Sequence, residues 1–149
     1  MGLTLLTQRN DQDSLTVGGI AELLVSEAFD RSRVTALRHV VATRAGESGL
    51  GGDRLADFVV AVNELLTNAV RHGGGTGHVA VWCAENFVIC EVTDHGAGLG
   101  AIRPDKPAPD EPGGWGLYLV RELTDTFEIK TGPEGTAVRI SSRTGNEKI

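Results

Sequence analysis

Three polar residues recur every four positions within residues 57–72, which read DFVVAVNELLTNAVRH. They are Glu64, Asn68 and His72. Because the apolar residues of this stretch recur at spacings of three and four, it is predicted to be an amphipathic helix. Residues four apart share one side of a helix, so the three polar groups form a row. A carboxylate, an amide and an imidazole in one row suit a base, a metal ligand and a hydrogen-bonding group, although a solvated helix face has the same pattern.

Two glycine-rich segments supply further candidates. The sequence DHGAG at residues 94–98 follows a run typical of a buried strand, and GGWGL at residues 113–117 opens a second run with helical spacing. Glycine lets the backbone pass close to a ligand, and the amides at a helix N-terminus bind phosphate. Each segment alone would be interpreted as a simple turn.

In chain order, ELLTNAVRH, DHGAG and GGWGL resemble the three sequence boxes of the GHKL (Bergerat-type) ATP-binding module. The compact length, the second glycine box and the closing Gly135-Thr136 are most similar to the bacterial anti-sigma-factor serine/threonine kinases. The resemblance covers roughly residues 33–142. It implies an α+β fold, a two-layer sandwich in which a mixed, mostly antiparallel sheet is covered on one face by about three helices.

The resemblance implies that ATP and Mg²⁺ are bound by the first box. Asn68 would hold Mg²⁺, which prefers oxygen ligands and retains several waters. Glu64, one helical turn away, is predicted to be the general base that takes a proton from an attacking hydroxyl. The attacker would be a serine or threonine of a partner protein, or water. His72 would lie near the phosphates, or would cap the exposed carbonyls at the helix end.

The other two boxes would bind the base and the remaining phosphates. The resemblance implies that Asp94 accepts the exocyclic amine of adenine and so selects ATP over GTP, while Gly96 and Gly98 pass under the purine. Thr136 would place a hydroxyl near the adenine. The phosphate-binding residues would be Gly113, Gly114, Gly116 and Leu117. Tyr118 replaces a further glycine of the family pattern, which leaves affinity and transfer rate open.

Composition limits the class of protein. The chain has 149 residues, 40% hydrophobic and 23% charged, as expected for one globular domain. Its net charge of −6 argues against sequence-independent nucleic-acid binding, which relies on clustered Lys and Arg. We find no signal peptide and no membrane-length apolar stretch. Cys83 and Cys90 lack metal-site spacing and are interpreted as core residues in a reducing cytosol, so we expect a cytoplasmic protein without a membrane partner.

Periodicity and breakers predict the remaining elements and the domain boundaries. We expect an N-terminal arm at 1–19, an ATP-binding domain at 20–142 and a tail at 143–149. The expected elements in order are a strand within 20–29, a helix at 33–47, the 57–72 helix, a hairpin at 79–93, a lid-like loop at 99–112, a helix at 114–126 and strands at 127–131 and 136–142.

Finer details of these elements are also predicted. Ser32 and Asp53 are expected to be the helix N-caps. Val40 is expected to face inward with Val34, Leu37 and Val41. In the hairpin, alternation places the cysteines on the face of the valines, with Trp82, Ile89 and Glu91 on the opposite face.

The sequence therefore predicts an ATP-binding kinase that resembles anti-sigma factors. It would sequester a sigma factor, phosphorylate an anti-anti-sigma (STAS-type) partner and form a homodimer. Two alternatives stay open: a nucleotide-sensing module with little or no phosphotransfer, and a domain without nucleotide in which the boxes are turns. A histidine kinase is disfavoured because we find no dimerisation helix with a phospho-acceptor histidine. A topoisomerase or chaperone would need further domains.

Overall fold

Residues 21–96 and 115–145 of the chain are described here from a computed structural model. The predicted arm at 1–19, the predicted loop at 99–112 and the site candidates Gly98, Gly113 and Gly114 lie outside these residues.

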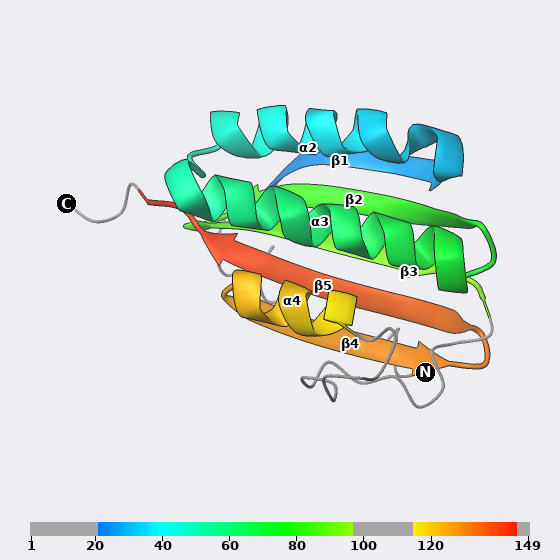
Figure 1. Cartoon of the computed structure of the whole chain (residues 1–149). Coiled ribbons are helices and arrows are strands. Elements are labelled where there is room, and N and C mark those ends of the chain that lie inside the picture. The colour runs from blue at the N-terminus through cyan, green and yellow to red at the C-terminus, as the bar shows by residue number, and fades with distance from the viewer. Residues whose placement is uncertain (1–20, 97–114, 146–149) are drawn as a thin grey trace.

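A five-stranded sheet forms one layer of the molecule (Figure 1). Its spatial order is β1-β2-β3-β5-β4, and each pair of neighbours is antiparallel. The strands are β1 (Ala21–Asp30), β2 (Thr76–Ala84), β3 (Phe87–Asp94), β4 (Thr126–Gly132) and β5 (Gly135–Arg143). β5 lies between β3 and β4, so β4 forms an edge of the sheet and the last strand of the chain lies inside it.

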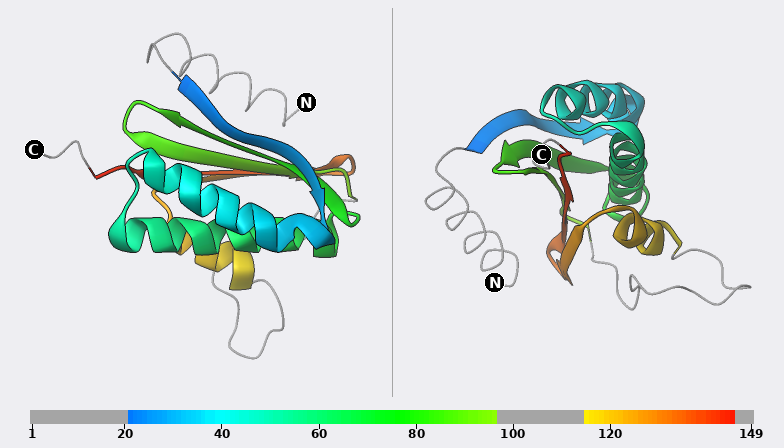
Figure 2. Two further views of the ribbon diagram at one scale, coloured as in Figure 1. Left: turned by 90° about the horizontal axis from the view of Figure 1, so that it is seen from above. Right: turned by 90° about the vertical axis from the view of Figure 1, so that its left-hand side faces the viewer.

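The helices form the second layer and cover one face of the sheet (Figure 2). They are the 3₁₀ turn η1 (Arg31–Arg33) and the helices α2 (Val34–Glu47), α3 (Gly52–His72) and α4 (Trp115–Leu123). This is the predicted α+β sandwich, and the strand predicted within 20–29 is confirmed as β1. None of the described helices is long and apolar enough to cross a membrane.

Helix α3 lies across the centre of the sheet because its apolar stripe is continuous. The buried side chains of this stripe are Phe58, Ala61, Val62, Leu65, Leu66 and Ala69. Burying one large aliphatic or aromatic side chain contributes about 1.5–3 kcal/mol, so packing outweighs any single surface interaction of the helix. The packing of this stripe orients α3 on the sheet, and it thereby fixes the positions of Glu64 and Asn68 in the neighbouring polar row.

The β2–β3 hairpin reverses at Glu85 and Asn86. Glu85 has a positive φ of 57°, as the two-residue loops of hairpins require. The register pairs Trp82 with Ile89 and Val81 with Cys90, which confirms the predicted faces. Cys90 is fully buried in the core, and burial raises the pKa of its thiol, so Cys90 is expected to be unreactive.

Neither Ser32 nor Asp53 is a helix N-cap. The N-cap of α2 is Arg33, whose side chain makes no capping hydrogen bond. The side chain of Asp30 accepts hydrogen bonds from the backbone N–H of Ser32 at 2.9 Å and from its hydroxyl at 2.6 Å. Asp30 therefore caps the 3₁₀ turn that precedes α2. The N-cap of α3 is Gly51, in an extended conformation, and Asp53 lies in the first helical turn, where its charge favours the helix dipole.

Two further details differ from the prediction. Val40 is 38% exposed, because Leu37, Val41 and Ala45 form the buried side of α2. Helix α4 ends at Leu123, three residues earlier than predicted. The hydroxyl of Thr124 donates to the carbonyl of Val120 at 2.9 Å, and the chain then enters β4 at Thr126.

Candidate functional site

A narrow cavity of about 20 Å³ lies between α3, the first turn of α4 and the middle of the sheet. It is lined by Leu65, Asn68, Ala69, Val92, Asp94, Leu117, Thr136 and Val138. Four of these are site residues predicted from the sequence: Asn68, Asp94, Leu117 and Thr136. They come from four different elements, so the fold brings together residues far apart in the chain.

Asp94 is the last residue of β3 and is only 8% exposed. One carboxylate oxygen, Oδ1, accepts a hydrogen bond from the backbone N–H of Gly96 at 3.0 Å. Thr136 is paired directly opposite Asp94 in the β3–β5 register, and its hydroxyl lies 2.8 Å from that of Thr131. A buried carboxylate and a buried hydroxyl therefore line the same cavity, as the adenine-binding prediction requires.

The first turn of α4 lies directly against the polar row of α3. A Cβ placed at Gly116 would be 2.7 Å from Oε1 of Glu64 and 3.5 Å from Nδ2 of Asn68. The next residue, Leu117, is buried and lines the cavity. The absence of a side chain at Gly116 thus lets the second glycine box approach Glu64 and Asn68 closely.

The remaining site candidates differ in their positions. Gly96 lies against the end of α3, because a Cβ at Gly96 would be 2.6 Å from Cα of Gly73. The predicted approach of Gly96 to a purine stays a prediction. His72 is exposed at the last position of α3 and is not among the residues that line the cavity.

The sequence interpretation did not assign a site role to the apolar residues of the lining. Leu65, Ala69, Val92 and Val138 belong to the core and supply apolar walls. Their hydrophobic periodicity marked them as buried, but periodicity does not tell a cavity wall from close-packed core. Gly73, which lies against Asp94, likewise received no site role from the sequence.

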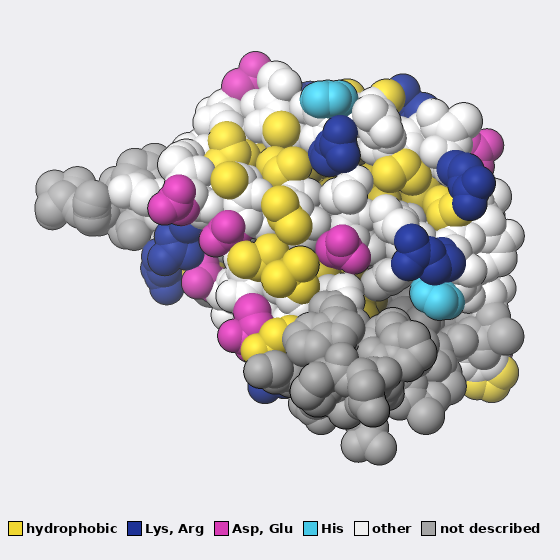
Figure 3. Space-filling model, viewed as in Figure 1, with side chains coloured by type: hydrophobic (Ala, Val, Ile, Leu, Met, Phe, Trp, Pro, Cys, Tyr) yellow, Lys and Arg dark blue, Asp and Glu magenta, His cyan; other side chains and the backbone are white. Residues whose placement is uncertain are grey.

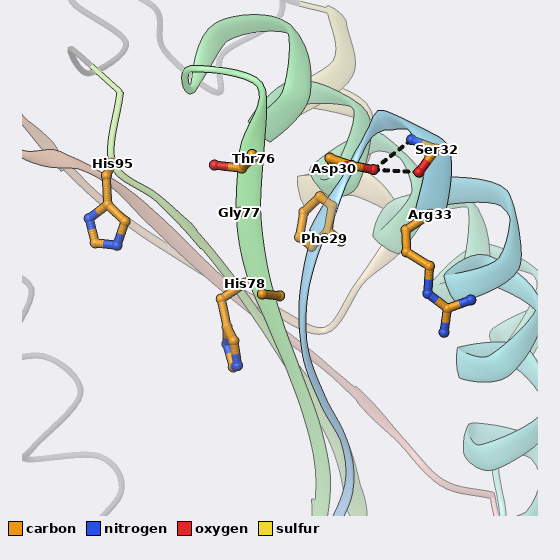
Figure 4. A pocket seen from close by; sticks show the side chains of 9 residues that line it. Phe29, Asp30, Ser32, Arg33, Thr76, Gly77, His78 and His95 are labelled. Atoms are coloured by element: carbon orange, nitrogen blue, oxygen red, sulfur yellow. Dashed lines mark hydrogen bonds between the residues drawn. The ribbon is translucent and has the colours of Figure 1, made fainter.

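A second, wider hollow of about 540 Å³ opens at the end of β1 and the start of β2 (Figure 4). It is lined by Ala28, Phe29, Asp30, Ser32, Arg33, Thr76, Gly77, His78 and His95. No predicted site residue lies in this wall. Arg33 pairs with Glu27, and this hydrogen bond together with the guanidinium charge lowers the pKa of the Glu27 carboxyl.

The charged side chains of the helical face are unevenly distributed (Figure 3). Basic side chains gather toward the end where α3 finishes, and they include Arg71 and His72 in its last turn. A basic group in the last turn favours the helix dipole, and it also raises the local concentration of anions. This end of α3 is the one that carries Asn68 and faces Asp94.

The chemistry of the narrow cavity suits a small polar ligand with a flat apolar part. Apolar walls with a few convergent polar groups are typical of ligand sites. At about 20 Å³ the cavity has room for about one water, so a purine ring would enter only as the walls open. No group of three His, Cys, Asp or Glu in the described residues could hold a metal by itself.

Comparison with known proteins tests this picture. Residues 27–142 match the histidine kinase-like ATPase domain family. The chain belongs to this family. Its similarity extends to a serine-protein kinase RsbW of Halalkalibacterium halodurans, 34% identical over 110 residues, which are 65% of this chain and 68% of the relative. An anti-sigma F factor of Thermoanaerobacter pseudethanolicus is 29% identical over 122 residues, 74% of this chain and 85% of the relative.

Two solved structures share the fold of this chain. One contains the RsbU and RsbW domains of a Mycobacterium tuberculosis protein, with a TM-score of 0.60 and 24% identity, over 80% of this chain and 32% of that chain. Another is the SiaB-SiaC complex from Pseudomonas aeruginosa, with a TM-score of 0.62 and 12% identity, over 93% of this chain and 99% of that chain. The predictions of the fold, of ATP use and of an anti-sigma-factor-like serine/threonine kinase are confirmed at the level of the family.

Proposed function

We propose that this chain binds Mg-ATP in the narrow cavity and transfers the γ-phosphoryl group to a serine or threonine of a partner protein. The observation that carries this proposal is the convergence of Asn68, Asp94, Leu117 and Thr136 on one cavity. Glu64 lies one helical turn beyond Asn68, against Gly116. Residues 20–142 would form the ATP-binding domain.

Asp94 would recognise the adenine. Its Oδ1 already accepts the Gly96 N–H, and a carboxylate has lone pairs left for the exocyclic amine of adenine. GTP presents a carbonyl oxygen at the same place, which would face a carboxylate without a proton between them. An unpaired buried acceptor costs about 1–3 kcal/mol, enough to favour ATP over GTP. The hydroxyl of Thr136, across the strand pair, would complete the polar side of the base site.

Glu64 and Asn68 would act on the phosphate end of the nucleotide. Bound Mg²⁺, held through Asn68 and the phosphates, would neutralise charge that develops during transfer. The partner's hydroxyl oxygen would form the new bond to the γ-phosphorus as the bond from that phosphorus to the bridging oxygen breaks, which leaves ADP. Glu64 would accept the hydroxyl proton. Gly98, Gly113 and Gly114 are proposed to complete the nucleotide site, with His72 at its phosphate end.

The partners are proposed from the names of the relatives. Proteins named anti-sigma F factor suggest a sigma factor as one partner, and the SiaB-SiaC complex shows a protein of this fold bound to another protein. The acceptor of the phosphoryl group would be an anti-anti-sigma protein, whose phosphorylation would leave the sigma factor sequestered. We propose a cytoplasmic homodimer for this assembly.

Two measurements test the proposal. Wild type should be stabilised by Mg-ATP but not by Mg-GTP in a thermal shift assay, because a ligand at 100 times its Kd stabilises a fold by about 2.7 kcal/mol. Asp94→Ala should lose this stabilisation. Transfer of radiolabelled phosphate from ATP to the anti-anti-sigma proteins of the same genome should occur with wild type and fall to a small residual rate with Glu64→Gln, which should still bind ATP.

The outcomes separate the proposal from its competitor. ATP binding without transfer to any anti-anti-sigma protein would favour the nucleotide-sensing module, in which Glu64→Gln has no activity to lose. The departure from the family's glycine pattern at Tyr118 favours that competitor. Absence of stabilisation by either nucleotide would overturn both.

A further inference from the structure

Gly73 follows the last residue of α3 in a conformation that does not require glycine. Its φ is −107° and its ψ is 22°. This is the bridge region, which residues with side chains also adopt. The left-handed turn that ends the helix is made by the next two residues, Gly74 and Gly75, with φ values of 92° and 94°. Neither backbone conformation nor helix termination therefore explains a glycine at position 73.

Space explains it. A Cβ at Gly73 would lie 2.5 Å from Oδ2 of Asp94 and closer still to its Cγ, a separation that real Cβ atoms do not show. The carboxylate of Asp94 thus occupies the volume that a side chain at position 73 would fill. The same Cβ would lie 2.6 Å from the carbonyl oxygen of Ala69, which is a backbone contact and needs a separate control.

Two other glycines hold Asp94 from different sides. The N–H of Gly96 donates to Oδ1 at 3.0 Å, and Gly96 itself packs on Gly73. Gly135, with a φ of 138°, packs against the backbone carbonyl of Asp94 so closely that no Cβ would fit. Asp94 is therefore enclosed by the end of α3, the segment after β3 and the start of β5.

We propose that Gly73 is a positioning residue for nucleotide selectivity, because its missing side chain fixes the direction in which the Asp94 carboxylate faces the cavity. This inference rests on the proposed function, in which Asp94 receives the adenine amine. A methyl group at position 73 would displace Oδ2, either toward the cavity or away from the Gly96 N–H. Both movements change the acceptor that distinguishes adenine from guanine.

The first test needs no nucleotide. The melting temperature is measured for wild type, Gly73→Ala, Asp94→Ala and the double variant. If Gly73 acts through the carboxylate, Gly73→Ala lowers Tm by about 3–5 °C in the wild-type background and by much less when Asp94 is already alanine. Equal destabilisation in both backgrounds would identify the Ala69 carbonyl as the cause and overturn the inference.

The second test measures Kd for Mg-ATP and Mg-GTP by isothermal titration calorimetry. Gly73→Ala should weaken ATP binding by roughly tenfold or more and reduce the ATP-to-GTP selectivity, because a displaced acceptor loses its charge-assisted hydrogen bond to the adenine amine. Gly51→Ala is the matched control at the other end of α3. Its φ is −142° and a Cβ there meets nothing within 4 Å, so both Kd values should stay as in wild type.

The two tests fail separately from the proposed function. No ATP binding by wild type overturns the proposed function, whatever the stability cycle shows. Binding by wild type with unchanged selectivity in Gly73→Ala overturns the inference about Gly73 alone. Loss of selectivity together with the coupled stability effect supports both.

Discussion

Two hollows of this molecule differ in volume and in the residues that line them, and the smaller one contains the predicted site residues. The wider hollow, a groove at the end of β1 and the start of β2, has a volume of about 540 Å³, whereas the cavity beside α3 has about 20 Å³. Yet the small cavity gathers Asn68, Asp94, Leu117 and Thr136, and the large groove gathers no predicted site residue. Convergent chemistry, and not volume, is what favours the small cavity as the candidate site.

The difference arises from how the polar groups of each region are bonded. In the groove, Asp30 accepts from Ser32, Arg33 pairs with Glu27, and His78 lies 3.2 Å from the hydroxyl of Ser26. The first two pairs secure the junction between β1 and α2, and the third joins β1 to β2. In the cavity, the carboxylate and hydroxyl are enclosed by apolar walls, where an additional hydrogen bond to a ligand gains more than it would at the surface. The groove stabilises a junction, and the cavity is suited to recognition.

The largest expected effect separates the two regions directly. Asp94→Ala should raise the Kd for Mg-ATP by about 100-fold or more, since a charge-assisted hydrogen bond in a buried site contributes about 1.5–3 kcal/mol and the N–H of Gly96 also loses its acceptor. Arg33→Ala, in the groove, should change that Kd by less than about twofold. Calorimetry at a temperature where both variants are folded measures this. Comparable losses in the two variants would reverse the assignment.

A smaller effect is expected within the site, at Gly116. Alanine there would bring a Cβ to 2.7 Å from the Glu64 carboxylate, which is the end of a flexible side chain and can move. A misplaced base slows transfer, so the phosphotransfer rate should fall by about tenfold while the Kd for ATP changes by less than about threefold. Alanine also favours helix formation, so α4 should remain folded.

The control for this variant uses Glu64 itself. In a Glu64→Gln background, Gly116→Ala should cause little further loss of transfer, because the group it displaces has already been removed. A full additional tenfold loss would show that Gly116 acts on the phosphates and not through Glu64.

A third prediction concerns the hydroxyl pair between β4 and β5. Thr131→Val removes the partner that lies 2.8 Å from the Thr136 hydroxyl. One neutral hydrogen bond contributes about 0.5–1.5 kcal/mol, so ATP binding should weaken by about two- to tenfold if Thr136 orients toward the base. The matched control is Thr126→Val, which removes an equivalent pair with Ser141 at 2.6 Å in the same strand pair. Equal changes in Kd would show that the effect is on the sheet and not on the site.

Much of this site could be predicted because its elements have strong local patterns. The polar row of α3 lies beside a long apolar stripe. One periodicity therefore predicts both the helix and the side of the helix on which Asn68 and Glu64 lie. Asp94 was identifiable because a run of buried-strand type ends there and a glycine-rich segment follows. The resemblance to a family placed Thr136 near the adenine, but the register of β3 with β5, which sets Thr136 opposite Asp94, was not predicted, since strand order is not a local property.

The errors have two origins, which are the local backbone conformation at helix ends and contacts between segments distant in sequence. Ser32 and Asp53 are good capping residues by type, but Asp30 and Gly51 have the extended backbone conformations that the ends of these helices need. Val40 is on the exposed side because α3 covers only one side of α2. The role of Gly73 depends on a carboxylate from another strand, and no pattern around residue 73 contains that information.

The smallest expected effect concerns acidity at the groove. The hydrogen bond and charge of Arg33 hold the pKa of Glu27 below its ordinary value in the folded state. The stabilisation from this pair is therefore fully present above the unfolded pKa of a glutamate and is lost as the pH falls through the lower folded pKa. Because both side chains are substantially exposed, at 44% for Arg33 and 32% for Glu27, solvent screening keeps the effect small.

The measurement compares Tm of wild type and Glu27→Gln from pH 7 to pH 3. The difference between them should be constant from pH 7 down to about 5 and should shrink at lower pH as the wild-type carboxylate takes up its proton. At pH 7 the stabilisation of Glu27→Gln by Mg-ATP should equal that of wild type. If Glu27→Gln stayed folded but was no longer stabilised by Mg-ATP, the groove would belong to the nucleotide site. A pair that only secures the β1–α2 junction changes the stability of the folded state equally with and without ligand.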